Sequence, residues 1–146
     1  MKTRLMLECV EEIDFSVLAI NSHAKAYKLC WNINKSLKLN FEKKEDHNIK
    51  KEDHNIKKEL WFARYTYVCD DEAEYTLLAN HSKKGCLIPS QKSINIFMLI
   101  KNDYWQQEKT EFINRLRDVK DILLVFEIDT NLTKHIDRFI FNDKKD

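Results

Sequence analysis

Cysteine and histidine have the widest chemical repertoire of the side chains in this chain, and their spacing limits what they can do. The four cysteines are Cys9, Cys30, Cys69 and Cys86, and no two of them form a C-x-x-C pair of the kind found in redox and metal centres. Cys69, His81 and Cys86 are three candidate zinc ligands, but a fourth ligand is not apparent and the spacing fits no usual zinc pattern. We therefore expect small core residues in a reducing compartment, and no metal site.

Motifs for acid–base and phosphate chemistry are also missing. The histidines are isolated or fall in a repeated segment, and no pair of carboxylates stands out as a general acid and base. A phosphate-binding loop, a dinucleotide fingerprint and a nucleophile elbow each need glycines at fixed spacing, whereas Gly85 is the only glycine of the chain. We predict no catalytic residues and no cofactor. An enzyme whose catalytic residues meet only in the fold is the alternative.

Aromatic and basic side chains on one helix are the best indication of a binding surface. On a helical wheel of about 100° per residue, a helix over residues 24–37 turns Tyr27 and Trp31 away from its apolar stripe. The two rings are neighbours because they are four residues apart, and they lie among Lys28, Lys35 and Lys38. We predict a binding surface made of these five residues.

This surface has two interpretations. Aromatic area ringed by lysines can dock an acidic partner protein, or it can stack a nucleic-acid base beside a phosphate contact. Alternatively, the helix is covered on two sides, and Tyr27 and Trp31 belong to the core. Burial statistics for aromatic residues favour the core, so we expect a largely buried Trp31 whose ring edge reaches the surface together with Lys35.

The elements that position these residues follow from apolar periodicity. Alternation predicts strands at about 5–9, 15–20, 61–69, 75–80, 94–101 and 122–128, and helical spacing predicts helices at about 24–37 and 103–119. The strands at 61–69 and 75–80 are expected to form an antiparallel hairpin. The strand at 94–101 is apolar on both faces and is expected in the centre of the sheet. The fold class is α+β, a mainly antiparallel sheet with two principal helices packed on it, for which a ferredoxin-like arrangement is the nearest common example.

A tandem repeat separates the first helix from the hairpin. Lys43–Ile49 recurs without change as Lys50–Ile56, and the next three residues begin a third copy. One apolar residue per copy gives no coiled-coil seam, and the acidic residues of this segment balance its lysines. We expect a single domain over residues 1–146 with a duplicated charged surface loop at about 42–59, in which His47 and His54 are equivalent exposed copies.

Charge and hydropathy limit the partners. The net charge of +1 provides no global attraction to nucleic acid or to acidic membranes. No apolar run approaches the roughly 18 residues of a membrane span, and the first residues do not fit a signal peptide. We expect a cytoplasmic protein with no membrane partner.

One segment carries a family resemblance. The run from Ile88 to Ile96 resembles the signature of the uncharacterised bacterial IPExxxVDY family: its first two residues match, while Ser90, Asn95 and Ile96 stand where the family has Glu, Asp and Tyr. Stretches at 14–20, 27–35 and 125–129 look like the family's pattern in the same order. The resemblance implies a small bacterial cytoplasmic domain and no particular activity. Because proline cannot donate a hydrogen bond to a sheet, we expect Pro89 at the entrance of the central strand.

The function predicted from these observations is a small non-enzymatic interaction module that binds a protein partner or its own copy through Tyr27, Lys28, Trp31, Lys35 and Lys38. An RNA-binding accessory protein is one alternative. An enzyme without a local motif is the other.

Overall fold

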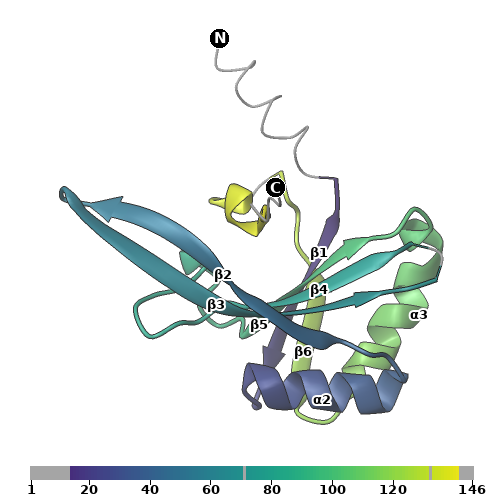
Figure 1. Ribbon diagram of the computed structural model, residues 1–146. Coiled ribbons are helices and arrows are strands. Elements are labelled where there is room, and N and C mark those ends of the chain that lie inside the picture. The colour runs from purple at the N-terminus through teal and green to yellow at the C-terminus, as the bar shows by residue number, and fades with distance from the viewer. Residues whose placement is uncertain (1–13, 71, 132, 142–146) are drawn as a thin grey trace.

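The computed structural model describes residues 14–70, 72–131 and 133–141 (Figure 1). The strand expected at 5–9 lies outside these residues. Within them the chain forms, in order, β1 (Ser16–Ser22), α2 (Ala26–Leu37), β2 (Glu42–Asp53), β3 (Ile56–Val68), β4 (Glu74–Ala79), the 3-10 helix η1 (Pro89–Gln91), β5 (Ile96–Lys101), α3 (Trp105–Arg117), β6 (Ile122–Glu127) and the 3-10 helix η2 (Ile136–Phe139).

The strands form one antiparallel sheet in the order β2-β3-β4-β5-β1-β6. With the β2–β3 hairpin set aside, the chain runs β1-α2-β4-β5-α3-β6, which is the β-α-β-β-α-β order of ferredoxin-like domains. The hairpin is inserted between α2 and β4 and adds two strands at the β4 edge. The predicted α+β class, with two helices packed on a mainly antiparallel sheet, is confirmed.

Each face of the sheet has its own apolar core. On the face that both helices cover, here the helix face, Ile20 and Met98 pack with Leu29 of α2 and Leu116 of α3. The opposite face, here the tail face, is covered by the loop between β4 and β5 and by η2, whose Phe139 is fully buried. All of β5 except its last residue is buried, so the expected central strand is confirmed. Neither helix in the described part of the chain has the length and apolar character needed to cross a membrane.

The expectation of a surface loop at 42–59 is wrong. The segment forms β2 and the first part of β3, and the two strands extend well beyond the rest of the sheet (Figure 1). His54 and Asn55 make the two-residue turn with φ of 53° and 66°, a left-handed conformation that His and Asn tolerate better than most residues. The apolar pattern gave no strand signal here because a solvent-exposed hairpin is held by backbone hydrogen bonds and needs no apolar stripe.

The two repeat histidines are not equivalent, so the expectation of two exposed copies is wrong. His54 lies exposed in the turn, whereas His47 lies on β2 and is buried against η2. The His47 Nε2–H donates to the carbonyl oxygen of Arg138 at 2.6 Å, and the ring meets that of Phe141 edge-on, with 4.7 Å between centroids. The first copy therefore lies entirely in β2, whereas the second copy ends β2, makes the turn at His54 and Asn55, and begins β3.

Pro89 also differs from its expected place. It is the first residue of η1 and not the entrance of β5, which begins at Ile96. A 3-10 helix accepts proline at its first position because the N–H that proline lacks has no partner there.

The segment that resembles the family signature is held by one buried side chain. Asn80 is 0% exposed, its Nδ2 donates to the carbonyl oxygens of Gln91 and Ile94 at 2.9 Å each, and its Oδ1 accepts from the N–H of Ile88 at 2.8 Å. This network gives the segment a structural role, since it closes the tail face of the sheet.

Candidate functional site

The outer side of α2 carries two large exposed aromatic rings. Tyr27 is 69% exposed and Trp31 is 56% exposed, whereas Leu29, Ile33 and Leu37 of the same helix are buried against the sheet. The wheel geometry therefore places both rings correctly, and the expected burial of Trp31 is wrong. Burial statistics for aromatic residues gave the wrong expectation because the sheet covers only one side of α2. The side that carries the two rings faces solvent.

Three lysines complete this surface, which we call the α2 surface: Tyr27, Lys28, Trp31, Lys35 and Lys38. The Lys35 ammonium lies 4.8 Å from the centroid of the Trp31 ring, within cation–π distance. No ion pair joins the three lysines to a carboxylate in the described part of the chain. The sequence between positions 15 and 41 contains no acidic residue, so α2 itself is purely cationic.

Polar side chains fix the position of α2 at several points. Asn32 donates to the carbonyl oxygen of Lys120 at 3.2 Å. Asn34 accepts from the N–H of Phe41 at 2.8 Å and donates to the carbonyl oxygen of the same residue at 3.1 Å. The Arg115 guanidinium donates to a carbonyl in the last turn of α2 at 3.3 Å. The α2 surface is therefore preformed on an anchored helix.

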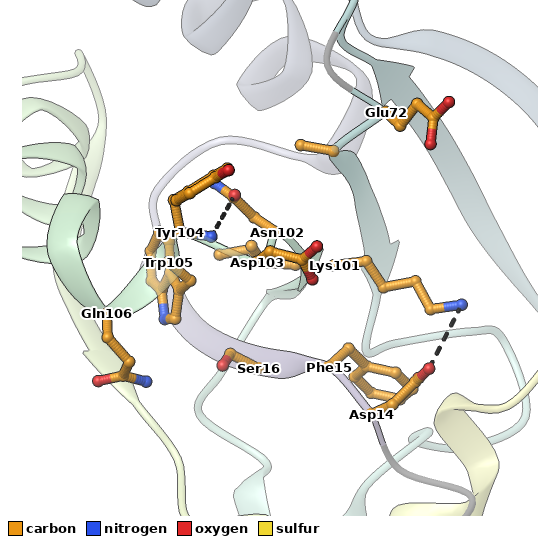
Figure 2. Close-up of a pocket in the computed structure, with 12 residues that line it drawn as sticks. Asp14, Phe15, Ser16, Glu72, Lys101, Asn102, Asp103, Tyr104, Trp105 and Gln106 are labelled. Atoms are coloured by element: carbon orange, nitrogen blue, oxygen red, sulfur yellow. Dashed lines mark hydrogen bonds and ion pairs between the residues drawn. The ribbon is translucent and has the colours of Figure 1, made fainter.

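A polar pocket lies at another part of the molecule, where β1 and β4 begin and β5 ends (Figure 2). It has a volume of about 440 Å³, and the Lys101 ammonium lies 3.9 Å from the Asp14 carboxylate at its rim. The Oδ1 of Asn102 accepts from the N–H of Tyr104 at 2.9 Å and so orders the entry to α3. In Figure 2 the carboxylates of Asp14, Glu72 and Asp103 occupy separate positions. Neither histidine nor cysteine is among the residues that line this pocket.

The three candidate zinc ligands do not come together. Cys69 lies before β4, where its N–H donates to the carbonyl oxygen of Ala73, while His81 and Cys86 pair beyond the other end of that strand. The six residues of β4 separate the two positions by about 20 Å at roughly 3.3 Å per residue. In the part of the chain that the structure describes, no group of His, Cys, Asp and Glu side chains forms a metal site.

The sequence did not predict the direct contact between the side chains of His81 and Cys86. The Cys86 thiol lies 3.5 Å from Nδ1 of His81, because the two residues face each other across an isolated antiparallel bridge. The available signal was their separation by a short polar loop containing the only glycine, which is typical of a tight reversal of the chain.

No family model, curated protein or solved structure matches the chain. Functional assignment therefore depends on the α2 surface and on the other polar sites described above.

Proposed function

We propose that this protein is a non-enzymatic interaction module that docks an acidic partner protein on the α2 surface. The observation that carries the proposal is the exposure of Tyr27 and Trp31, side by side on α2, among lysines that pair with no carboxylate of the described residues. Tyrosine and tryptophan dominate the hot spots of protein interfaces, because their large rings gain most from leaving water. Lysines around such rings favour a partner whose surface carries carboxylates.

Charge also favours a different protein over a second copy of this chain. A two-fold symmetric interface sets the same patch of both subunits face to face. Two α2 surfaces would then bring Lys28, Lys35 and Lys38 of both copies together, and their repulsion opposes association.

RNA is the less favoured ligand. Base stacking needs an open ring face, and the Lys35 ammonium lies over one face of Trp31. The net charge of +1 also provides no wider field to hold a phosphate backbone.

The resemblance to the IPExxxVDY family adds to the proposal a bacterial cytoplasmic setting. We propose the chain as a divergent relative of that family. A family member with a different strand order would contradict this relationship.

Affinity capture from a lysate of the source cells, with matched variants, tests the proposed function. The full chain is immobilised as wild type, as Trp31→Ala and as Lys28→Glu, beside Tyr104→Ala and Lys92→Glu as controls that remove an equally exposed ring and an exposed lysine elsewhere. Captured proteins are identified by mass spectrometry and purified for direct titration. We expect one acidic protein that binds wild type and both controls, and binds the two α2 variants at least about tenfold more weakly, as loss of a hot spot would cause.

Three outcomes would contradict the proposal. Equal retention by all variants would mean that the α2 surface is not used. Retention that nuclease abolishes would favour RNA. A wild-type dimer in analytical ultracentrifugation that Trp31→Ala converts to monomer would favour self-association.

A further inference from the structure

The loop that follows β4 holds a thiol beside an imidazole. Cys86 Sγ lies 3.5 Å from His81 Nδ1, within the distance of a hydrogen bond to sulfur, and the two residues form an antiparallel bridge. His81 is exposed and Cys86 is partly exposed, so both are accessible to a dissolved reagent.

The loop between the two residues is ordered by its own hydrogen bonds. The Ser82 N–H donates to the carbonyl oxygen of Gly85 at 2.9 Å, and the Ser82 hydroxyl donates to the same oxygen at 3.0 Å. The Lys84 N–H in turn donates to the Ser82 hydroxyl oxygen at 3.2 Å. These contacts order the loop that brings the thiol and the imidazole together.

The surroundings of this loop are cationic. Lys83 and Lys84 are exposed at its tip, and no acidic residue occurs in the sequence between Glu74 and Asp103. From η2, the Arg138 guanidinium donates to the carbonyl oxygen of Leu87 at 2.8 Å and adds a third positive charge close to Cys86. Anionic reagents are therefore attracted to this end of the molecule.

The other described cysteines lack these features. Cys30 is buried, and burial raises the pKa of its thiol to about 11. Cys69 is partly exposed like Cys86, and its side chain hydrogen-bonds with Tyr67 instead of an imidazole. The same chain thus supplies a buried thiol and a partly exposed thiol as internal references.

We propose that Cys86 is a nucleophilic modification site that exchanges with small anionic disulfides, with His81 as its proton acceptor. The step uses the His81 tautomer that carries its proton on Nε2, so that Nδ1 takes the thiol proton. The Cys86 thiolate attacks one sulfur of the disulfide R–S–S–R, and a new S–S bond forms as the old one breaks. The leaving thiolate takes a proton from the imidazolium. The products are a Cys86 mixed disulfide, whose sulfur is oxidised, and one R–SH, whose sulfur is reduced.

Competitive labelling of the full chain tests this site. Folded protein is treated with dithiobis(nitrobenzoate), an anionic disulfide, or with cystamine, a cationic one, and peptide mapping assigns the rate of modification to each cysteine. We expect dithiobis(nitrobenzoate) to modify Cys86 about tenfold faster than Cys69, since Cys86 has an imidazole beside it to take the thiol proton. In His81→Gln and His81→Asn the Cys86 rate should fall by about tenfold while the Cys69 rate stays unchanged. The double variant Lys83→Gln, Lys84→Gln should slow the anionic reagent by about threefold, and it should speed the cationic one, which the lysines repel.

The buried Cys30 is the control for folding. Because it is inaccessible in the folded protein, its modification in a variant would show that the variant has unfolded. The proposal is overturned if Cys86 reacts no faster than Cys69. It is equally overturned if both His81 variants, with Cys30 still protected, modify Cys86 at the wild-type rate. An equal effect of the double lysine variant on both reagents would contradict the preference for anionic disulfides.

Discussion

His47 and His54 occupy the same position in two identical stretches of sequence, and the fold gives them different neighbours. His47 contacts the carbonyl oxygen of Arg138 in η2 and the ring of Phe141 just after it, whereas His54 lies in the hairpin turn. Because their flanking residues are the same, any difference between equivalent substitutions at the two positions reports the different structural environments and not the local sequence.

We therefore expect His47→Asn and His54→Asn to differ in stability. His47→Asn removes a buried hydrogen bond and a ring contact, and should lower the free energy of unfolding by about 1–3 kcal/mol. His54→Asn places a residue that favours the left-handed region at a φ of 53°, and should change that energy by less than about 0.5 kcal/mol. Urea denaturation of both variants beside wild type measures the difference. Equal losses would mean that His47 is not held as described.

The two tryptophans on the helices offer a second residue-scale comparison. Trp31→Ala should cost less than about 1 kcal/mol because the ring is exposed, whereas Trp105→Ala should cost about 3–5 kcal/mol because that ring is 3% exposed in the core. Chemical denaturation gives both values. A Trp31→Ala loss as large as that of Trp105→Ala would place Trp31 in the core and remove the basis for the α2 surface.

At the scale of elements, the hairpin shows how a repeat of odd length is accommodated. Lys44 pairs with Arg64 and His47 pairs with Phe62, so β2 uses two residues where β3 uses one. This bulge absorbs the odd residue of the seven-residue copy, and the pairing is regular from there to the turn. If β2 were shifted along β3 by the seven residues of one copy, the second copy would present to β3 the same side chains that the first copy presents now. Phe41, buried and fixed through both its N–H and its carbonyl by Asn34, selects the observed register.

Deletion of one copy is the prediction that belongs to this hairpin. Removal of Lys43–Ile49 or of Lys50–Ile56 gives the same chain, so the remaining copy must take the buried position of His47. All pairs up to Ile49 with Leu60 can then be kept, with the next three residues as the loop. Residues 50–52 and 54–56, which the hairpin then loses, are exposed, so the free energy of unfolding should fall by less than about 1 kcal/mol. A loss above about 2 kcal/mol on urea denaturation would mean that the hairpin tip is packed.

The elements differ in how far the sequence predicts them. α2 and β3 to β5 have apolar residues at the period of their structure, because each buries one or both faces. β2 has no such period, since its outer part touches only solvent and β3. The helical wheel places Trp31 away from the apolar stripe of α2. Whether a second element covers that side depends on the arrangement of all elements, which the sequence of the helix does not predict. The His81–Cys86 contact depends on a bridge between residues that carry no apolar signal.

At the scale of the molecule, the C-terminal segment joins parts that are distant in the sequence. Phe139 packs on Phe97 of the central strand with 5.0 Å between ring centroids, while Arg138 contacts both β2 and the loop before η1. The tail face has no helix of the length of α2 or α3 over it in the described residues, so η2 and the loop between β4 and β5 are its cover.

The substitution Phe139→Ala tests whether this segment closes the fold. It opens a cavity at a fully buried site between η2 and β5, and should lower the free energy of unfolding by about 3–5 kcal/mol. Because η2 also holds the carbonyl of Leu87, amide hydrogen exchange should rise across residues 80–95 as well as across 136–141. Leu123→Ala, which truncates a side chain that is exposed on the edge strand β6, is the control and should change neither quantity. If Phe139→Ala loses less than about 1 kcal/mol and leaves exchange in residues 80–95 unchanged, the tail face is stable without its C-terminal cover.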